Sequence, residues 1–176
     1  MKRIRLTLCL LFLPLMTYAE DFPSNISLSN GQLQKCSQTE ITVMMFIDVA
    51  KAALFSSDCA QLPRLTDELQ LSFIYQRDFK GEDFVEAAET LLQRNLSRDE
   101  YQQIESELDR FNQHYQAVKE GDRYDVRLTR AGLYLIKNDE VISHSSSLVL
   151  GKRYYQIWFG QKPFNDKMKQ ALLMPG

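Results

Sequence analysis

Two consecutive amphipathic helices, set between two groups of strands, constrain the fold of this chain more than any other feature of its sequence. After Lys80-Gly81, apolar residues recur at helical spacing, at Phe84, Ala87, Ala88, Leu91 and Leu92. Ser97 and Glu100 have the spacing of a capping box and begin a second helix. Its apolar stripe comprises Tyr101, Ile104, Leu108, Phe111, Tyr115 and Val118. We expect this helix to end at Gly121-Asp122.

Alternating apolar residues predict strands on either side of these helices. Residues 25–36 alternate weakly around a turn at Asn30-Gly31, and residues 42–55 are rich in Val, Ile, Phe and Met, which is typical of a central strand. Residues 69–75 alternate clearly and should pair with that strand. Beyond the helices, residues 124–142 alternate through two turns, which predicts an antiparallel meander.

The C-terminal part again favours helices. Ser145 to Ser147 can cap a helix that runs through residues 148–158 and ends at Gly160, and Asn165 can cap a short last helix. The order of strands, two helices, strands and two helices predicts an α+β fold, in which helices cover one face of an antiparallel sheet.

The N-terminus has the features of a secretory signal peptide. Basic residues precede an apolar run, and Thr17-Tyr18-Ala19 forms a cleavage site of small-x-small type. A membrane anchor is the alternative, but eleven apolar residues interrupted by Pro14 are too few to cross about 30 Å of hydrocarbon. We therefore expect cleavage after Ala19, one domain over residues 20–176 without a transmembrane segment, and a periplasmic or secreted location.

Two cysteines, Cys36 and Cys59, remain in the mature chain. An even count suggests a disulfide in an oxidising compartment. If residues 41–55 formed one straight strand, however, its ends would lie about 50 Å apart, which is far beyond the reach of a disulfide. The strand must bend or the thiols stay apart, and the sequence leaves the question open.

Composition and motifs exclude several classes of function. The formal net charge is −2, and loss of the basic leader makes the mature chain more acidic, which disfavours nucleic-acid binding. His114 and His144 lack metal-ligand spacing, and the chain has no nucleophile elbow, dinucleotide fingerprint or Walker loop. We therefore predict no metal, no cofactor and no catalytic residue, while any protein partner stays unknown.

An aromatic and polar set is what remains to line a pocket. Its members are Tyr75, Arg77, Tyr124, Arg127, Tyr134, Tyr154, Tyr155 and Trp158. Arginine and tyrosine beside an apolar cleft could hold a small acidic hydrophobic ligand. Alternatively, the tyrosines pack on the sheet and the arginines lie at strand edges.

Four segments resemble the exported bacterial chalcone-isomerase-like proteins. They are residues 46–55 (FIDVAKAALF), 75–84 (YQRDFKGEDF), 115–124, which end in GDRY, and 155–160 (YQIWFG), which Pro163 follows. The resemblance runs in order over about residues 28–173. It implies an open-faced β-sandwich, in which a layer of helices covers a large antiparallel sheet.

The resemblance also implies which polar groups an active enzyme would need. Plant enzymes of this superfamily close a chalcone to a flavanone, with a strand arginine and tyrosine, asparagine and threonine groups around the substrate. No arginine lies between Ala19 and Arg64 here, and Lys35 is the nearby cation. The helical tyrosine falls at Phe84 and the asparagine at about Leu91. Most of the enolate stabilisation would be lost.

Other members of the superfamily bind fatty acids without catalysis. Our leading hypothesis is therefore a non-catalytic protein that binds a small hydrophobic or fatty-acid-like ligand, with candidate contacts from Lys35, Tyr75, Arg77, Phe84, Leu91 and Tyr124. An isomerase of unknown substrate would instead need Lys35, Tyr75 and Arg77 to converge. A cell-envelope module that binds a protein partner would have a packed cleft beneath an exposed aromatic patch.

Overall fold

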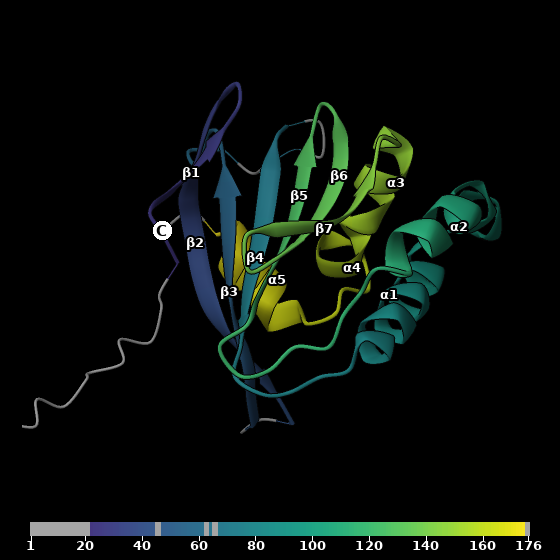
Figure 1. The fold of residues 1–176 in the computed structure, drawn as a ribbon, viewed down its shortest axis with the longest axis horizontal. Coiled ribbons are helices and arrows are strands. Elements are labelled where there is room, and N and C mark those ends of the chain that lie inside the picture. Colours follow the sequence, from purple (N-terminus) through teal and green to yellow (C-terminus); the bar gives the residue numbers. More distant parts are fainter. Residues whose placement is uncertain (1–21, 45–46, 62–63, 65–66, 175–176) are drawn as a thin grey trace, which may run out of the picture.

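A seven-stranded antiparallel sheet forms the framework of the protein, with its strands in sequence order (Figure 1). The computed structural model describes residues 22–44, 47–61, 64 and 67–174, so the expected signal peptide lies outside the described residues. The strands are β1 (Asn25–Leu28), β2 (Gly31–Val43), β3 (Ile47–Ser56), β4 (Leu69–Tyr75), β5 (Arg123–Thr129), β6 (Gly132–Lys137) and β7 (Glu140–Ser145).

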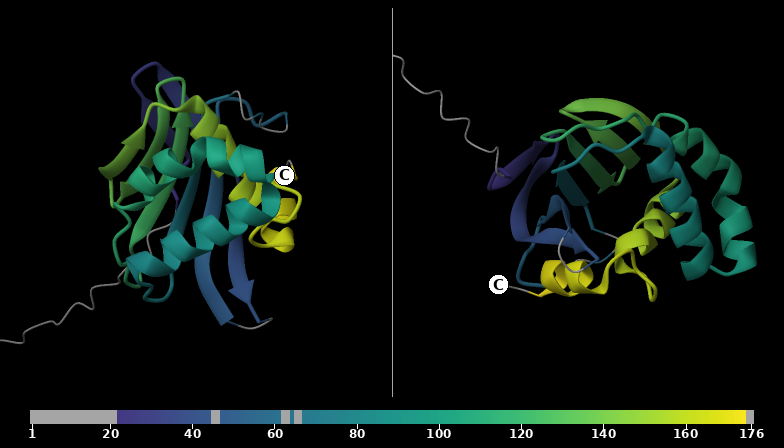
Figure 2. Two further views of the ribbon diagram at one scale, coloured as in Figure 1. Left: turned by 90° about the vertical axis from the view of Figure 1, so that its right-hand side faces the viewer. Right: turned by 90° about the horizontal axis from the view of Figure 1, so that it is seen from below.

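Helices cover one face of this sheet. They are α1 (Gly81–Asn95), α2 (Arg98–Asn112), α3 (Leu148–Tyr154), α4 (Gln156–Phe159) and α5 (Asp166–Leu173). Figure 2 shows the sheet curled, with the helices along its open side. The predicted α+β fold with helices on one face of an antiparallel sheet is thereby confirmed. Among the described residues, no helix is both long and apolar enough to cross a bilayer.

The predicted central strand over residues 42–55 is wrong, because the chain reverses within it. β2 runs on to Val43, Met44 adopts a positive φ of 50°, and β3 begins at Ile47, directly paired with Val43. Composition alone could not reveal this turn, since its residues are as apolar as the strands that it joins. The predicted pairing with residues 69–75 holds for β3, which pairs with β4 over seven residue pairs.

This hairpin also answers the question about the cysteines. Because β3 runs back along β2, Cys36 and Cys59 come together with their Cα atoms 5.0 Å apart, and they form a disulfide. Cys36 lies at a register shift of β2, between Lys35 and Ser37. The geometric objection to the bridge therefore rested on the straight strand, which does not exist.

The second predicted helix is shorter than its apolar stripe. α2 has the expected capping box between Ser97 and Glu100, but it ends at Asn112 instead of at Gly121-Asp122. The chain continues in a segment that pairs with the residues before α1, through backbone hydrogen bonds between Phe79 and Val118 of 3.1 and 2.9 Å. Tertiary pairing has therefore overridden the helical periodicity of the last two stripe residues.

The other helix predictions need one correction. Ser147 caps α3 and Asn165 caps α5, as expected. The single helix expected over residues 148–158 is instead interrupted at Tyr155, which separates α3 from α4, and Gly160 ends α4. This break leaves the side chains of Tyr154 and Trp158 on the inner side of the molecule, where they contact each other.

The two faces of the sheet bury different sets of residues. The main core lies between the inner face and the helices, and includes Leu54, Leu71, Val126 and Leu135. A smaller cluster on the outer face contains Phe22, Leu33, Ala53 and Phe55. The candidate site lies on the inner side.

Candidate ligand-binding pocket

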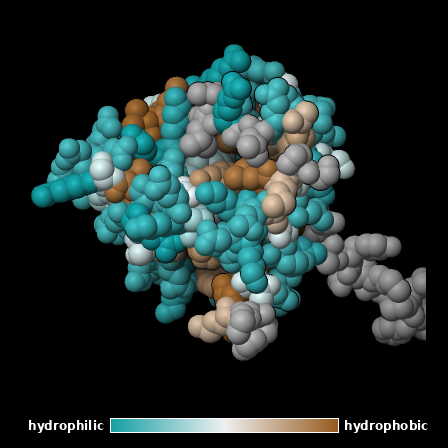
Figure 3. All heavy atoms as spheres, turned by 180° about the vertical axis from the view of Figure 1, so that it is seen from behind, coloured by the Kyte–Doolittle hydropathy of each residue, from teal (hydrophilic) through white to brown (hydrophobic). Residues whose placement is uncertain are grey.

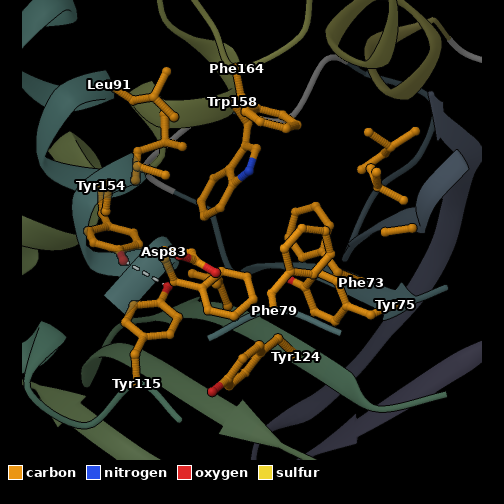
Figure 4. A pocket seen from close by; sticks show the side chains of 18 residues that line it. Phe73, Tyr75, Phe79, Asp83, Leu91, Tyr115, Tyr124, Tyr154, Trp158 and Phe164 are labelled. Atoms are coloured by element: carbon orange, nitrogen blue, oxygen red, sulfur yellow. Dashed lines mark hydrogen bonds between the residues drawn. The ribbon is translucent and has the colours of Figure 1, made fainter. Parts of the chain in front are cut away.

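A cavity of about 250 Å³ opens between the inner face of the sheet and helices α1, α3 and α4 (Figure 4). Most of its lining side chains are aliphatic or aromatic. They come from β2 to β5, from three helices and from three connecting segments. The lining residues are Ile41, Val49, Ala50, Phe73, Tyr75, Phe79, Asp83, Phe84, Ala87, Ala88, Leu91, Tyr115, Tyr124, Val126, Tyr154, Ile157, Trp158 and Phe164.

Phe84 of α1 lies at the centre of an aromatic wall. Its ring stacks on Tyr115, with 5.4 Å between centroids, and meets the edges or faces of Tyr75 and Tyr124 at 5.4 and 5.3 Å. Close approach of the two segments depends on Gly81, where a Cβ atom would lie only 2.7 Å from the carbonyl oxygen of Tyr115. Such ring pairs contribute about 0.5–1.5 kcal/mol each beyond burial, which makes this wall rigid.

Three tyrosine hydroxyls of the lining are hydrogen-bonded within the protein. The hydroxyls of Tyr115 and Tyr154 lie 2.9 Å apart, and Tyr154 donates to Oδ1 of Asn112 at 3.2 Å. The Tyr124 hydroxyl donates to the carbonyl of Gln116 at 2.8 Å and accepts from its backbone N–H at 2.9 Å. These hydroxyls therefore hold the wall in place and are not free for a ligand.

Two other polar groups of the lining have no hydrogen-bond partner among the described residues. They are the hydroxyl of Tyr75 and the indole N–H of Trp158. Figure 4 shows the Trp158 nitrogen turned into the cavity. Each of these two groups can donate a hydrogen bond to an acceptor atom of an occupant.

The lining tyrosines stay protonated under physiological conditions. Burial raises the pKa of Tyr75, Tyr115, Tyr124 and Tyr154 above the usual value of a phenol. They therefore act as neutral hydroxyl groups and not as general bases.

Four of the six predicted ligand contacts line this cavity, namely Tyr75, Phe84, Leu91 and Tyr124. Their role in binding stays a prediction. Lys35 and Arg77 are not part of the cavity lining, so the structure does not bring them together with the other four.

The positions of Lys35 and Arg77 have a physical reason. Lys35 pairs with Phe55, whose ring lies in the outer cluster, and its Nζ donates to the carbonyl of Phe22 at 3.3 Å. Arg77 follows the end of β4, where its Nε donates to the carbonyl of Asp48 at 3.0 Å.

The other members of the predicted aromatic and polar set lie partly in the cavity lining and partly outside it. Tyr154 and Trp158 line the cavity, whereas Tyr155 is buried behind it and donates to the carbonyl of Val126 at 2.8 Å. Arg127 donates from Nε to Oε1 of Gln70 at 2.6 Å, and Tyr134 stacks on His144 with centroids 4.3 Å apart. Arg127, Tyr134 and Tyr155 therefore have partners within the protein, and Arg127 lies inside β5 between β4 and β6.

Several lining residues escaped sequence analysis. Ala87 and Ala88 belong to the apolar stripe of α1, and this stripe was a signal for an inward face but not for an empty space beside it. Ile41 and Val49 lie on either side of the chain reversal between β2 and β3, which the sequence did not reveal, and Phe164 lies in a loop without any periodic pattern. In the described part of the chain, no three His, Cys, Asp or Glu residues gather in a way that could hold a metal ion.

Comparisons with known proteins agree with this architecture. A family model described as chalcone isomerase-like matches residues 23–174. The crystal structure of a fatty-acid binding protein from Arabidopsis thaliana is similar to the fold, with a TM-score of 0.60 and 13% sequence identity, over 86% of this chain and 90% of that one. No curated protein sequence matches the chain. Because the family model spans nearly the whole described chain, the protein belongs to the chalcone isomerase-like family.

Proposed function

We propose that this protein binds a small hydrophobic molecule in the inner cavity and does not catalyse a reaction on it. The observation that carries this proposal is a cavity of about 250 Å³ with a mostly apolar lining. Cavities of roughly 150 Å³ already hold a benzene molecule when their walls are apolar. The Arabidopsis neighbour is a fatty-acid binding protein, and this likeness supports a binding function for the shared fold.

The isomerase hypothesis finds less support in the geometry. It needed Lys35, Tyr75 and Arg77 to converge, and only Tyr75 lines the cavity. Phe84 and Leu91, at the positions where the family resemblance implies a tyrosine and an asparagine, are both part of the lining. Since one oxyanion donor contributes about 3 kcal/mol to catalysis, replacing two of them by hydrocarbon disfavours enolate chemistry.

The partner-binding hypothesis expected a packed cleft beneath an exposed aromatic patch. The cleft is open, and hydrophilic residues cover most of the face seen in Figure 3, with hydrophobic residues in separate patches. Phe164 is the only aromatic residue among the large hydrophobic side chains that are exposed in the described part of the chain, at 40% exposure. An open cavity without an exposed aromatic cluster over it, among the described residues, therefore supports ligand binding more than partner binding.

We also propose that the protein is exported and acts in the periplasm or outside the cell. The leader of residues 1–19 supports this, and so does the disulfide between Cys36 and Cys59, since disulfides persist in oxidising compartments. Cell fractionation followed by N-terminal sequencing should yield a chain that begins at Glu20. A cytoplasmic protein that retains Met1 would contradict export.

Native mass spectrometry of the protein from its natural source tests the binding function. We expect a mass above that of the polypeptide, which falls to the polypeptide mass on denaturation. The variant Ala88→Phe, which places a ring in the cavity, should be purified at the bare mass. If the wild-type protein also carries no extra mass and binds none of a panel of hydrophobic compounds, the proposed function fails.

A further inference from the structure

The cavity lining carries no positive charge in the part of the chain that the structure describes. None of the lining residues is Lys, Arg or His, and the one charged side chain among them is Asp83. Asp83 lies in the first turn of α1, where its Oδ2 accepts the backbone N–H of Lys80 at 2.8 Å. The charge that the lining carries is therefore negative.

The positive end of α1 does not change this balance. A helix N-terminus can attract an anion, but Glu82 and Asp83 already place two carboxylates in this first turn. An anionic ligand group there would meet repulsion from both of them. The helix terminus is thus complemented by the protein itself.

Cations on neighbouring elements are held by backbone carbonyl groups. Nε of Arg94 donates to Lys162 at 2.8 Å, and Nζ of Lys169 donates to Gly160 at 2.7 Å. Arg77 donates to the carbonyl of Asp48. None of these cations is part of the cavity lining.

The uncharged polar groups of the lining favour a different kind of ligand. The indole N–H of Trp158 and the hydroxyl of Tyr75 can both donate to an oxygen atom, and neither has a protein partner among the described residues. A carbonyl, ester, ether or hydroxyl oxygen could accept these hydrogen bonds without bringing a charge into an apolar cavity. An ionised carboxylate would lose its hydration and gain no counter-ion.

From this geometry we infer that the ligand is an uncharged hydrophobic molecule with a hydrogen-bond acceptor oxygen, and not a fatty-acid anion. This inference rests on the proposed binding function and specifies its ligand class. It separates this cavity from a site that pairs a carboxylate with a buried arginine.

A matched pair of ligands tests the inference, with 1-decanol and decanoate as probes. The chain has a single tryptophan, Trp158, which lines the cavity, so tryptophan fluorescence reports directly on occupancy. We expect 1-decanol to bind at least about tenfold more tightly than decanoate at neutral pH, because the unpaired carboxylate is desolvated. Equal or tighter binding of decanoate would overturn the inference and leave the binding function standing, whereas no response to either probe would count against both.

A second experiment tests the same inference by introducing a cation at the cavity. Ala87 lines the cavity and is partly exposed, so Ala87→Arg can place a guanidinium there in a helix that tolerates arginine well. Decanoate should then bind about tenfold more tightly than it binds the wild-type protein, while 1-decanol should not gain. Ala117→Arg, at an exposed position outside the lining, is the matched control and should change neither affinity. If Ala87→Arg leaves decanoate binding unchanged, the missing cation does not set the ligand class.

Discussion

The two faces of β4 and β5 are built from the same strands but carry opposite kinds of side chain. On the inner face, Phe73 lies beside Tyr124 and both line the cavity. On the outer face, Ser72 lies beside Asp125, within a polar cluster that also contains Gln70, Arg123 and Arg127. Strand alternation therefore separates an uncharged aromatic face from a charged one, only one residue apart.

Arg123 of the outer face pairs with two carboxylates. Asp125 is only 2% exposed and accepts a hydrogen bond from Nε of Arg123 at 3.1 Å. Arg123 also pairs with the exposed Asp139. Burial raises the pKa of Asp125 more strongly than the neighbouring guanidinium lowers it. The Arg123 guanidinium thus offsets part of the cost of burying this carboxylate.

The comparison teaches where a charged ligand could be accommodated. The outer face supplies a counter-ion for a buried charge, but its charged groups are bonded to other side chains of the protein. The inner face has the empty space, but it supplies only neutral donors. A ligand of the inner cavity must therefore bring little charge, and each of the following predictions perturbs one of the two faces.

The largest expected effect is alkaline unfolding, caused by the tyrosines of the inner side. Burial raises the pKa of Tyr75, Tyr115, Tyr154 and Tyr155 above 10.0, so above that pH the unfolded chain loses protons that the folded protein retains. The free energy of unfolding should therefore fall as pH rises, approaching about 1.4 kcal/mol per pH unit for each tyrosine. Urea unfolding on both sides of pH 10 measures this slope.

The variant Tyr155→Phe is the control for that slope. It removes one buried phenol and should reduce the pH dependence by about one proton. A slope that is unchanged in this variant, or a wild-type stability that is flat above pH 10, would contradict the assignment of alkaline instability to these buried groups.

The next largest effect is expected on the outer face, from Arg123→Met. This change leaves Asp125 buried without its counter-ion and should lower the free energy of unfolding by about 3 kcal/mol. Asp139, the other partner of Arg123, has a side chain that is 84% exposed. Asp139→Asn should therefore lower the free energy of unfolding by only about 0.5 kcal/mol or less. Equal losses in the two variants would show that burial does not distinguish the two ion pairs.

The smallest effects separate two tyrosines of the cavity. Tyr154→Phe removes a hydroxyl that is bonded to Tyr115 and Asn112, so it should destabilise the protein by about 1 kcal/mol. Tyr75→Phe removes a hydroxyl without a protein partner, so stability should stay nearly constant while the affinity for 1-decanol falls severalfold. Thermal unfolding and fluorescence titration of both variants check this, and the reverse order of stabilities would be inconsistent with the hydrogen bonds described.

Local signals in the sequence predicted much of the fold. The capping box at Ser97 and Glu100, the cap at Asn165 and the alternation of residues 69–75 all gave elements that the structure contains. The errors arose where tertiary contacts decide. The reversal between β2 and β3 lies within a continuous apolar run, and Tyr115 and Val118 continue a helical stripe although their segment pairs with Phe79.

The candidate site could be predicted only in part, for a related reason. Tyr75, Phe84, Leu91 and Tyr124 follow from inward alternation and helical periodicity. The side on which Lys35 lies could not be read from the sequence, because β2 has a register shift beside it. The empty space itself depends on how three helices meet the sheet, which no local pattern encodes.

The measurement that tests the central claim most directly compares 1-decanol binding to the wild-type protein and to Ala88→Phe. Ala88 lines the cavity and is 4% exposed, so the new ring must occupy the space proposed for the ligand. Ala117→Phe adds the same ring at an exposed position outside the lining. If all three proteins unfold cooperatively, we predict that Ala88→Phe loses at least about tenfold in affinity while Ala117→Phe binds like the wild type. Equal binding by all three proteins would contradict a ligand site in this cavity.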